Sequence, residues 1–213
     1  MKLAVLVSGR GSNLQALIDA CARDDFPAEI ALVLSNKADA YGLERARAAN
    51  IPTAVLSHKN FADRESFDEA MSAKIEEAGA ELVCLAGFMR LLSDGFVRQW
   101  RDRLINIHPS LLPAFKGLHV HERTIEEGAR FSGCTVHFVR PAMDEGPIIS
   151  QAVVPVHPTD TPDDLAARIL EQEHIIYPRA VKCIAEGRVR VSAERVLITE
   201  HEVPEGALNN PTR

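Results

Sequence analysis

Residues 2–21 read KLAVLVSGRGSNLQALIDAC, and this stretch decides the fold class. It begins with a short run of apolar and β-branched residues from Lys2 to Val7, which has the length and composition of a buried strand. After a glycine-rich turn, apolar residues between Leu14 and Cys21 recur at the spacing of one helix face. The stretch therefore predicts a strand, a loop and a helix, the repeating unit of a parallel α/β sheet.

The same alternation of short apolar runs and helical segments continues along the chain. We predict a three-layer α/β/α fold with a seven-stranded, mostly parallel sheet and a Rossmann-like amino-terminal half. Residues 1–198 are expected to form one domain and residues 199–213 a poorly ordered tail. The further strands are expected at 29–34, 53–56, 81–86, 104–108, 134–139 and 148–156, and the further helices at 42–50, 64–78, 94–103, 120–128 and 162–187.

Composition narrows the classes of function. The chain has 213 residues, of which 46% are hydrophobic and 25% charged, and this excludes a wholly disordered protein. With 24 basic and 30 acidic residues, its net charge of −6 disfavours nucleic-acid and anionic-membrane partners. No apolar run approaches the roughly 18 residues of a membrane span. We therefore expect a soluble, cytoplasmic protein that holds any anionic ligand with local groups.

The loop from Ser8 to Asn13 is the first candidate binding site. Backbone amides at the start of a helix, together with the helix dipole, favour an anion such as phosphate. A dinucleotide fingerprint needs a third glycine where Leu14 stands, and a P-loop needs Gly-Lys-Ser/Thr, which is missing here. A tight turn with Ser12 as the helix cap is the structural alternative.

A second candidate site lies at the end of the strand predicted at 104–108. Alternation along this strand places Asn106 and His108 on one face, at the carboxyl end where α/β sheets bind ligands. Pro109 and Pro113 restrict the loop that follows, which helps to hold the histidine in one orientation. Without further partners, a structural role for both polar residues is the simpler interpretation.

Asp144 supplies that further partner if its loop folds back onto His108. The carboxylate would then stabilise the imidazolium form of the histidine. Asn106 could donate to the oxyanion of a tetrahedral intermediate while His108 protonates it. The three residues therefore fit acyl transfer in which the nucleophile comes from the substrate.

Two other chemistries fit the sequence less well. Ser110 is the hydroxyl nearest to His108, but no Gly-x-Ser-x-Gly elbow surrounds it, so a serine hydrolase is disfavoured. The spacings of His119, His121 and His137 match no standard zinc site, so we expect no bound metal.

The predicted helix 162–187 carries one acidic residue on its apolar stripe. Glu173 stands where the next apolar residue belongs, so its carboxylate is expected to point inward or into a cleft. Pro178 cannot donate to the carbonyl of His174, which predicts a kink and a free carbonyl group there.

Taken together, these residues resemble one family, the phosphoribosylglycinamide formyltransferases of purine biosynthesis. The resemblance extends from about Leu3 to Gly187. It rests on five motifs in order: SGRGSNLQ at 8–15, SNKADAYGLERA at 35–46, LAGFMRLL at 85–92, NIHPSLLP at 106–113 and QEHIIYP at 172–178.

The resemblance implies transfer of a formyl group from 10-formyltetrahydrofolate, as cosubstrate, to the amine of glycinamide ribonucleotide, by direct attack and without a metal. It also implies a role for each matching residue. Glycinamide ribonucleotide would be bound by Gly11, Ser12, Asn13 and Glu173, catalysis carried by Asn106, His108 and Asp144, and the folate bound by Arg64, Met89, Arg90, Leu91, Leu92 and Asn106.

Related activities remain as alternatives. A formyltetrahydrofolate deformylase and a methionyl-tRNA formyltransferase share the Asn-x-His and downstream Asp pattern, but both carry an added domain for which we expect no room in this chain. The negative net charge also disfavours tRNA. A non-catalytic nucleotide-binding module would use only the glycine loop and leave Asn106, His108 and Asp144 without a role.

Overall fold

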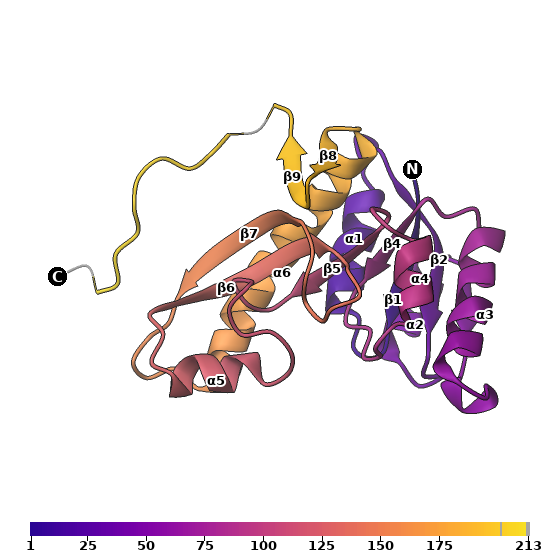
Figure 1. The fold of residues 1–213 in the computed structure, drawn as a ribbon, viewed down its shortest axis with the longest axis horizontal. Helices are drawn as coiled ribbons and strands as arrows, with labels where there is room; N and C mark the ends of the chain where they lie inside the picture. The colour runs from indigo at the N-terminus through magenta and orange to yellow at the C-terminus, as the bar shows by residue number, and fades with distance from the viewer. Residues whose placement is uncertain (201, 212–213) are drawn as a thin grey trace.

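The computed structural model describes residues 1–200 and 202–211 (Figure 1). Its main sheet has seven strands in the order β3-β2-β1-β4-β5-β6-β7. The first five in that order are parallel, and β6 and β7 are antiparallel additions at one side. The predicted α/β fold is thus confirmed. The strands are β1 (Lys2–Val7), β2 (Glu29–Ser35), β3 (Thr53–Val55), β4 (Leu82–Leu85), β5 (Leu104–His108), β6 (Phe131–Phe138) and β7 (Ile148–Pro155).

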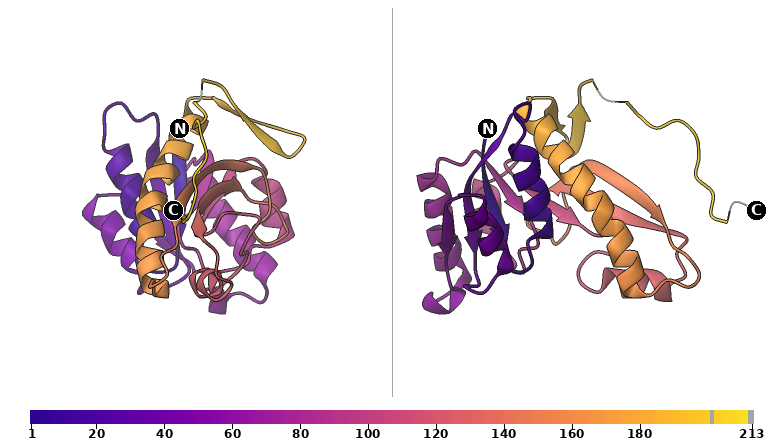
Figure 2. Two further views of the ribbon diagram at one scale, coloured as in Figure 1. Left: turned by 90° about the vertical axis from the view of Figure 1, so that its left-hand side faces the viewer. Right: turned by 180° about the vertical axis from the view of Figure 1, so that it is seen from behind.

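Helices cover both faces of the sheet (Figure 2). The alternation of β1 shows why: Leu3, Val5 and Val7 pack in a core with residues of α1, α2 and α6, whereas Ala4 and Leu6 pack in a second core with α3 and α4. The helices are α1 (Ser12–Cys21), α2 (Tyr41–Ala48), α3 (Arg64–Glu77), α4 (Asp94–Gln99), α5 (Val120–Glu126) and α6 (Pro162–Ala185), with a 3₁₀ turn at His58–Asn60.

Helix α6 is the longest helix and runs diagonally across the molecule (Figure 2). It starts with Thr161 and Asp164, which cap each other's backbone amides reciprocally, and with Pro162 in the first turn. It continues through Pro178 to Ala185. Glu173 is only 6% exposed, so the predicted inward direction of its side chain is confirmed.

A carboxyl-terminal hairpin of β8 (Val189–Ser192) and β9 (Arg195–Ile198) was not expected from the sequence. It forms a separate two-stranded sheet whose apolar side chains pack against the larger hydrophobic core. The two residues of its turn, Ala193 and Glu194, both have positive φ, as a tight hairpin turn requires.

Residues 202–211, after β9, arc away from the sheets in the view of Figure 1. Residues 202–211 form neither helix nor strand, but Asn210 Nδ2 donates to the carbonyl of Arg130 at 2.6 Å. Residues 201, 212 and 213 of the predicted tail lie outside the described residues, and the single domain at 1–198 stays a prediction. Among the helices of the described chain, none is both long and apolar enough to cross a bilayer.

Candidate active site

The loop between β1 and α1 leaves backbone amides unused at a helix start. Gly11 is the N-cap of α1, in the left-handed conformation with φ of 69°, and Gln15 N donates to its carbonyl at 2.9 Å. The N–H groups of Ser12, Asn13 and Leu14 therefore have no place in the helix ladder. The alternative in which Ser12 caps the helix is wrong, because Ser12 is already the first helical residue. Free amides at the positive end of a helix dipole suit an anion.

Two glycines allow this loop to lie against the start of α2. A Cβ on Gly11 would stand 2.7 Å from the Cα of Gly42, and one on Gly42 would stand 3.1 Å from Cγ2 of Val7. The close approach is completed by a hydrogen bond from Gly42 N to the carbonyl of Gly9 at 3.0 Å. The loop conformation thus depends on glycine at both positions.

Glu173 is tied directly to the loop. Its Oε2 accepts from Asn13 Nδ2 at 2.6 Å, and both side chains are buried. Burial raises the pKa of the Glu173 carboxyl, and the hydrogen bond from Asn13 partly opposes this. The structure therefore brings Gly11, Ser12, Asn13 and Glu173 together, although they lie on two helices 160 residues apart.

His108, at the end of β5, is held between two oxygen atoms. Its Nδ1 lies 3.5 Å from Oδ1 of Asp144, and its Nε2 donates to the carbonyl of Phe115 at 3.0 Å. The second carboxylate oxygen of Asp144 accepts from Gly117 N at 2.7 Å. The side chains of His108 and Asp144 are 7% and 13% exposed. A proton delivered from Nε2 would require the Phe115 carbonyl to give up its hydrogen bond.

Asn106 has a partner that sequence reasoning missed. It lies opposite His137 of the antiparallel strand β6, with Nδ2 3.4 Å from Nε2 of that histidine. His137 Nδ1 faces the carbonyl of Phe138 at 3.1 Å, and because a carbonyl only accepts, Nδ1 carries the proton. Burial lowers the pKa of His137, so its Nε2 is left to accept from Asn106. His137 therefore orients the Asn106 amide.

The sequence held only a weak signal for this role of His137. From the sequence alone, His137 is weighed only as a metal ligand, because its pairing with Asn106 depends on an antiparallel neighbour for β5. Within the part of the chain that the structure describes, no three side chains of ligating type gather closely enough to hold a metal ion. That no metal binds stays a prediction.

The segment after β4 carries four of the predicted folate-binding residues. It is tied to the glycine loop, because Met89 N donates to Ser8 Oγ at 2.8 Å. The side chains of Met89 and Leu91 are 69% and 59% exposed, although both are apolar, while Leu92 packs against the core. The exposed side chains thus stand beside the strand that carries Asn106 and His108, where they could contact a ligand.

The buried carboxyl group of Asp68 experiences the positive charges of Arg64 and Arg90. Asp68 is 2% exposed and accepts from Ser93 N at 2.6 Å. Burial raises the pKa of the Asp68 carboxyl, whereas the Ser93 bond and the two arginines lower it. Arg90 also lies over the ring of Phe67, 5.3 Å from its centroid. The charges of Arg64 and Arg90, two of the predicted folate-binding residues, therefore both act on the Asp68 carboxylate, which sequence reasoning did not identify.

The sheet order fixes the distance between the two parts of the site. Strand β4 lies between β1, which leads to the glycine loop, and β5, which carries His108. Two strand spacings separate the two carboxyl ends by roughly 10 Å. This arrangement suits a ligand with a phosphate at one end and a reactive group at the other.

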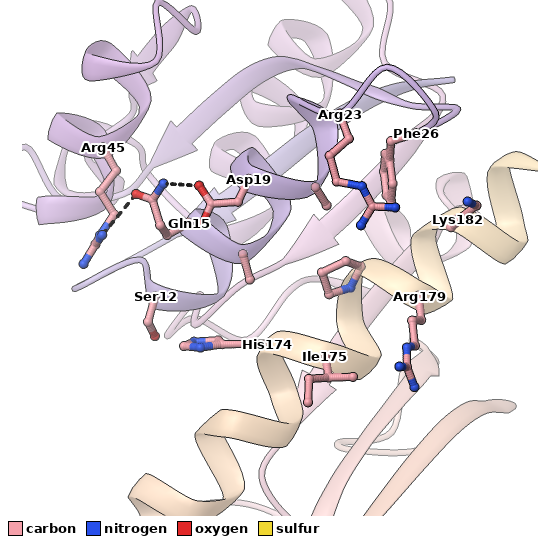
Figure 3. A pocket seen from close by; sticks show the side chains of 13 residues that line it. Ser12, Gln15, Asp19, Arg23, Phe26, Arg45, His174, Ile175, Arg179 and Lys182 are labelled. Atoms are coloured by element: carbon pink, nitrogen blue, oxygen red, sulfur yellow. Dashed lines mark hydrogen bonds between the residues drawn. The ribbon is translucent and has the colours of Figure 1, made fainter.

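A basic hollow adjoins the glycine loop between α1 and α6 (Figure 3). It has a volume of about 730 Å³ and begins at Ser12 and His174. Along its α1 side, Arg45 donates to Gln15, which in turn donates to Asp19 (Figure 3). The lining side chains include one carboxylate and four cations, from Arg23, Arg45, Arg179 and Lys182. Arg23 and Lys182 are both paired with Asp25, so the positive charge of the hollow rests mainly on Arg45 and Arg179.

The sequence was compared with protein families and with known proteins. The "Formyl transferase" family model matches residues 1–181. Phosphoribosylglycinamide formyltransferase of Haemophilus influenzae is 44% identical over 98% of this chain and 99% of its own length. The chain is also 52% identical, over 91% of its length, to the trifunctional purine biosynthetic protein adenosine-3 of Drosophila melanogaster. It spans only 14% to 19% of the length of such trifunctional relatives.

Solved structures give the same result. The crystal structure of glycinamide ribonucleotide transformylase 1 from Symbiobacterium toebii superposes with a TM-score of 0.91 at 47% identity, covering 93% of both chains. That of phosphoribosylglycinamide formyltransferase from Anaplasma phagocytophilum gives a TM-score of 0.88 at 44% identity, covering 95% of this chain and 96% of the other. The chain therefore belongs to the formyl transferase family and, within it, to the phosphoribosylglycinamide formyltransferases.

Proposed function

We propose that the protein transfers the formyl group of 10-formyltetrahydrofolate to the amine of glycinamide ribonucleotide, giving formylglycinamide ribonucleotide and tetrahydrofolate in purine biosynthesis. The observation that carries the proposal is the contact of Asp144 with His108, two strands away from a helix start with unused amides. Membership of the family supports the activity, and the geometry of the site is compatible with the residue roles proposed below.

Each end of the site suits one part of the substrates. The amides of Ser12 and Asn13 would hold the phosphate of the ribonucleotide, and the Glu173 carboxylate would accept from its ribose hydroxyls. The exposed side chains of Met89 and Leu91 would pack on the folate ring system. The cations of Arg64 and Arg90 would attract the folate carboxylates.

The chemistry between the two ends requires no covalent enzyme intermediate. The amine lone pair attacks the formyl carbon, and the carbonyl electrons move to oxygen, where Asn106 and protonated His108 donate hydrogen bonds. When the bond to N10 of the folate breaks, N10 gains one proton and the attacking nitrogen loses one. His108 can relay this proton while Asp144 stabilises its charged form. Reactants and products therefore balance without an added acid or base.

A two-substrate assay tests the proposal. Consumption of 10-formyltetrahydrofolate is followed with and without glycinamide ribonucleotide, and formylated ribonucleotide is measured as product. We expect both changes only when both substrates are present. Loss of the formyl group to water alone would indicate a deformylase, and binding without turnover would indicate a nucleotide-binding module. Cytoplasmic location and the lack of nucleic-acid and membrane partners stay predictions from the sequence.

A further inference from the structure

The loop from β6 to β7, residues 139–147, has to travel back across the sheet to deliver Asp144. Strand β6 is antiparallel to β5, so it ends beside Leu104, at the opposite end of β5 from His108. The loop closes tightly at its base, where Phe138 N donates to Pro147 O at 2.9 Å. Asp144 itself has a positive φ of 52°, in the left-handed region that aspartate tolerates better than most residues do.

The base of this loop carries a buried cation. The side chain of Arg140 is only 9% exposed, and its guanidinium donates to Oε2 of Glu194 and Oδ1 of Asp102, each at 2.6 Å. Its backbone N–H donates to Glu145 O at 3.1 Å, across the loop from the side chain contacts. We call Asp102, Arg140 and Glu194 the Arg140 cluster. Through it, one planar guanidinium joins three segments of the chain.

The two carboxylates of the Arg140 cluster come from different parts of the fold, each of which is fixed by its own contacts. Asp102 lies two residues before β5, the strand that carries Asn106 and His108. Glu194 lies in the turn of the β8–β9 hairpin, beyond residues 1–181 that the family model matches. The hairpin packs on the main core through its apolar side chains. The Arg140 cluster thus links the Asp144 loop to β5 and to this hairpin.

We propose that Arg140 is a positioning residue for the transfer reaction proposed above: held by Asp102 and Glu194, it fixes the base of the loop that presents Asp144 to His108. Arg140 is remote from the substrates and acts through Asp144. The role rests on the proposed function, because it supposes that the contact between Asp144 and His108 serves the chemistry. Small displacements of a catalytic group cost much rate, which makes a fixed loop base valuable.

Because the two carboxylate partners of Arg140 are exposed, an effect of Arg140 on catalysis can be distinguished from an effect on folding stability. The side chains of Asp102 and Glu194 are 42% and 53% exposed, so both carboxylates can be hydrated if the guanidinium is removed. Replacing Arg140 therefore leaves no charge buried without a partner. Arg140→Met keeps most of the apolar stem and removes the cross-link, so we expect little loss of folding stability.

The test uses the full-length protein and a matched control. Arg101 is an exposed residue that also pairs with Glu194, so Arg101→Met removes a second ion pair of this carboxylate without releasing the loop base. For Arg140→Met we expect kcat to fall roughly 10- to 100-fold. The KM for glycinamide ribonucleotide and the kcat of Arg101→Met should stay within about twofold of wild type. Arg140→Lys should recover part of the rate, and Glu194→Gln should lose less than Arg140→Met.

A second readout does not depend on activity. The NMR signals of the His108 ring should shift in Arg140→Met in the same direction as in Asp144→Asn, and stay unchanged in Arg101→Met. Equal kcat in Arg140→Met and Arg101→Met, or a lower kcat explained by a matching fall in Tm and not relieved by lysine, would overturn the proposal. If Arg140→Met does not fold, Arg140→Lys and Glu194→Gln decide by the same criteria. An inactive wild type would refute the proposed function, while the NMR comparison would still decide whether Arg140 places Asp144.

Discussion

The proposed site has two walls that are held in different ways. The first wall is the glycine loop, residues 8–13, and the second wall is the Asp144 loop, residues 139–147. The glycine loop is held by backbone contacts: Gly11 lies against Gly42, and its amides are set by the start of α1. The Asp144 loop also has backbone hydrogen bonds at its base, but charged side chains from distant segments tie it to the rest of the fold, through the Arg140 cluster and the 2.7 Å pair of Lys116 with Glu145. In the proposed reaction, the first wall binds the phosphate of the ribonucleotide. The second wall carries the Asp144 carboxylate, which has to be aligned with His108 for the chemistry.

This difference suggests that one wall serves substrate binding and the other serves the chemical step, and mutations can test these two roles separately. Changes in the glycine loop should act on binding of the ribonucleotide, whereas changes around His108 and Asp144 should act on kcat. Interactions formed only in the transition state raise kcat, and interactions present throughout lower KM.

The largest effect is expected for His108→Ala. Loss of the imidazole removes both proton transfer and the donor to the oxyanion, so kcat should fall by about 10²- to 10⁴-fold. The KM for glycinamide ribonucleotide should change by no more than about twofold, because His108 ends β5, two strands away from the glycine loop. Steady-state kinetics with both substrates varied measure this, with His157→Ala as the control at an exposed histidine. A raised KM with normal kcat in His108→Ala would contradict the separation of binding and catalytic roles between the two walls.

The next effect concerns the first wall, through Gly11→Ala. The added Cβ would stand 2.7 Å from the Cα of Gly42, and the positive φ of Gly11 is strained for alanine, at a cost of about 1–3 kcal/mol. The KM for glycinamide ribonucleotide should rise roughly tenfold, with a smaller change in kcat. Gly9→Ala is a matched control, because no atom lies within 4 Å of the Cβ position there. Equal KM values in the two variants would show that the loop conformation does not govern phosphate binding.

The same contrast explains what could be predicted from the sequence. The fold and the glycine loop are encoded locally, by apolar periodicity and by contiguous residues such as Gly11, Ser12 and Asn13. The inward direction of Glu173 followed from a single break in a helical stripe. Asn106 and His108 share a strand, and alternation alone placed them on one face.

The remaining parts depend on pairings between distant segments. The orienting role of His137 required an antiparallel strand beside β5, and no local pattern specifies that choice. The β8–β9 hairpin lies where the sequence offers only short, weakly alternating runs. The carboxylates that bind Arg140 come from residues 38 and 54 positions away in the chain, a separation that periodicity cannot bridge.

Glu173→Gln is expected to have a moderate effect and to separate binding from stability. Glutamine can still accept from Asn13 but carries no charge, so the KM for the ribonucleotide should rise severalfold as the ribose hydroxyls lose a charged acceptor. Burial raises the pKa of Glu173 above its usual value of 4.5, which means that the folded protein binds this proton more tightly than the unfolded chain does.

The consequence for stability has a definite sign. Ionisation of Glu173 opposes folding, and this loss of stability grows as the pH rises from the unfolded pKa through the folded one. The Glu173→Gln variant should therefore melt at a higher temperature than wild type at neutral pH, and the difference should shrink towards zero in acid below pH 4. Thermal melts of both proteins across this range measure the effect. A lower Tm for the variant at neutral pH would show that the carboxylate is stabilised by the site.

The smallest effect is expected at the edge of the first wall, in the basic hollow of Figure 3. Arg179→Glu reverses one of its four cations without touching the glycine loop. If the hollow attracts the anionic ribonucleotide, kcat/KM should fall about two- to fivefold at low ionic strength, and the loss should fade as salt screens the charge. Arg98→Glu on α4 changes the net charge equally on the opposite face of the sheet, so it isolates the effect of position. Equal kcat/KM in the two variants at every salt concentration would mean that the hollow does not attract the ribonucleotide. The backbone amides of the first wall would then bind the phosphate without help from these side-chain charges.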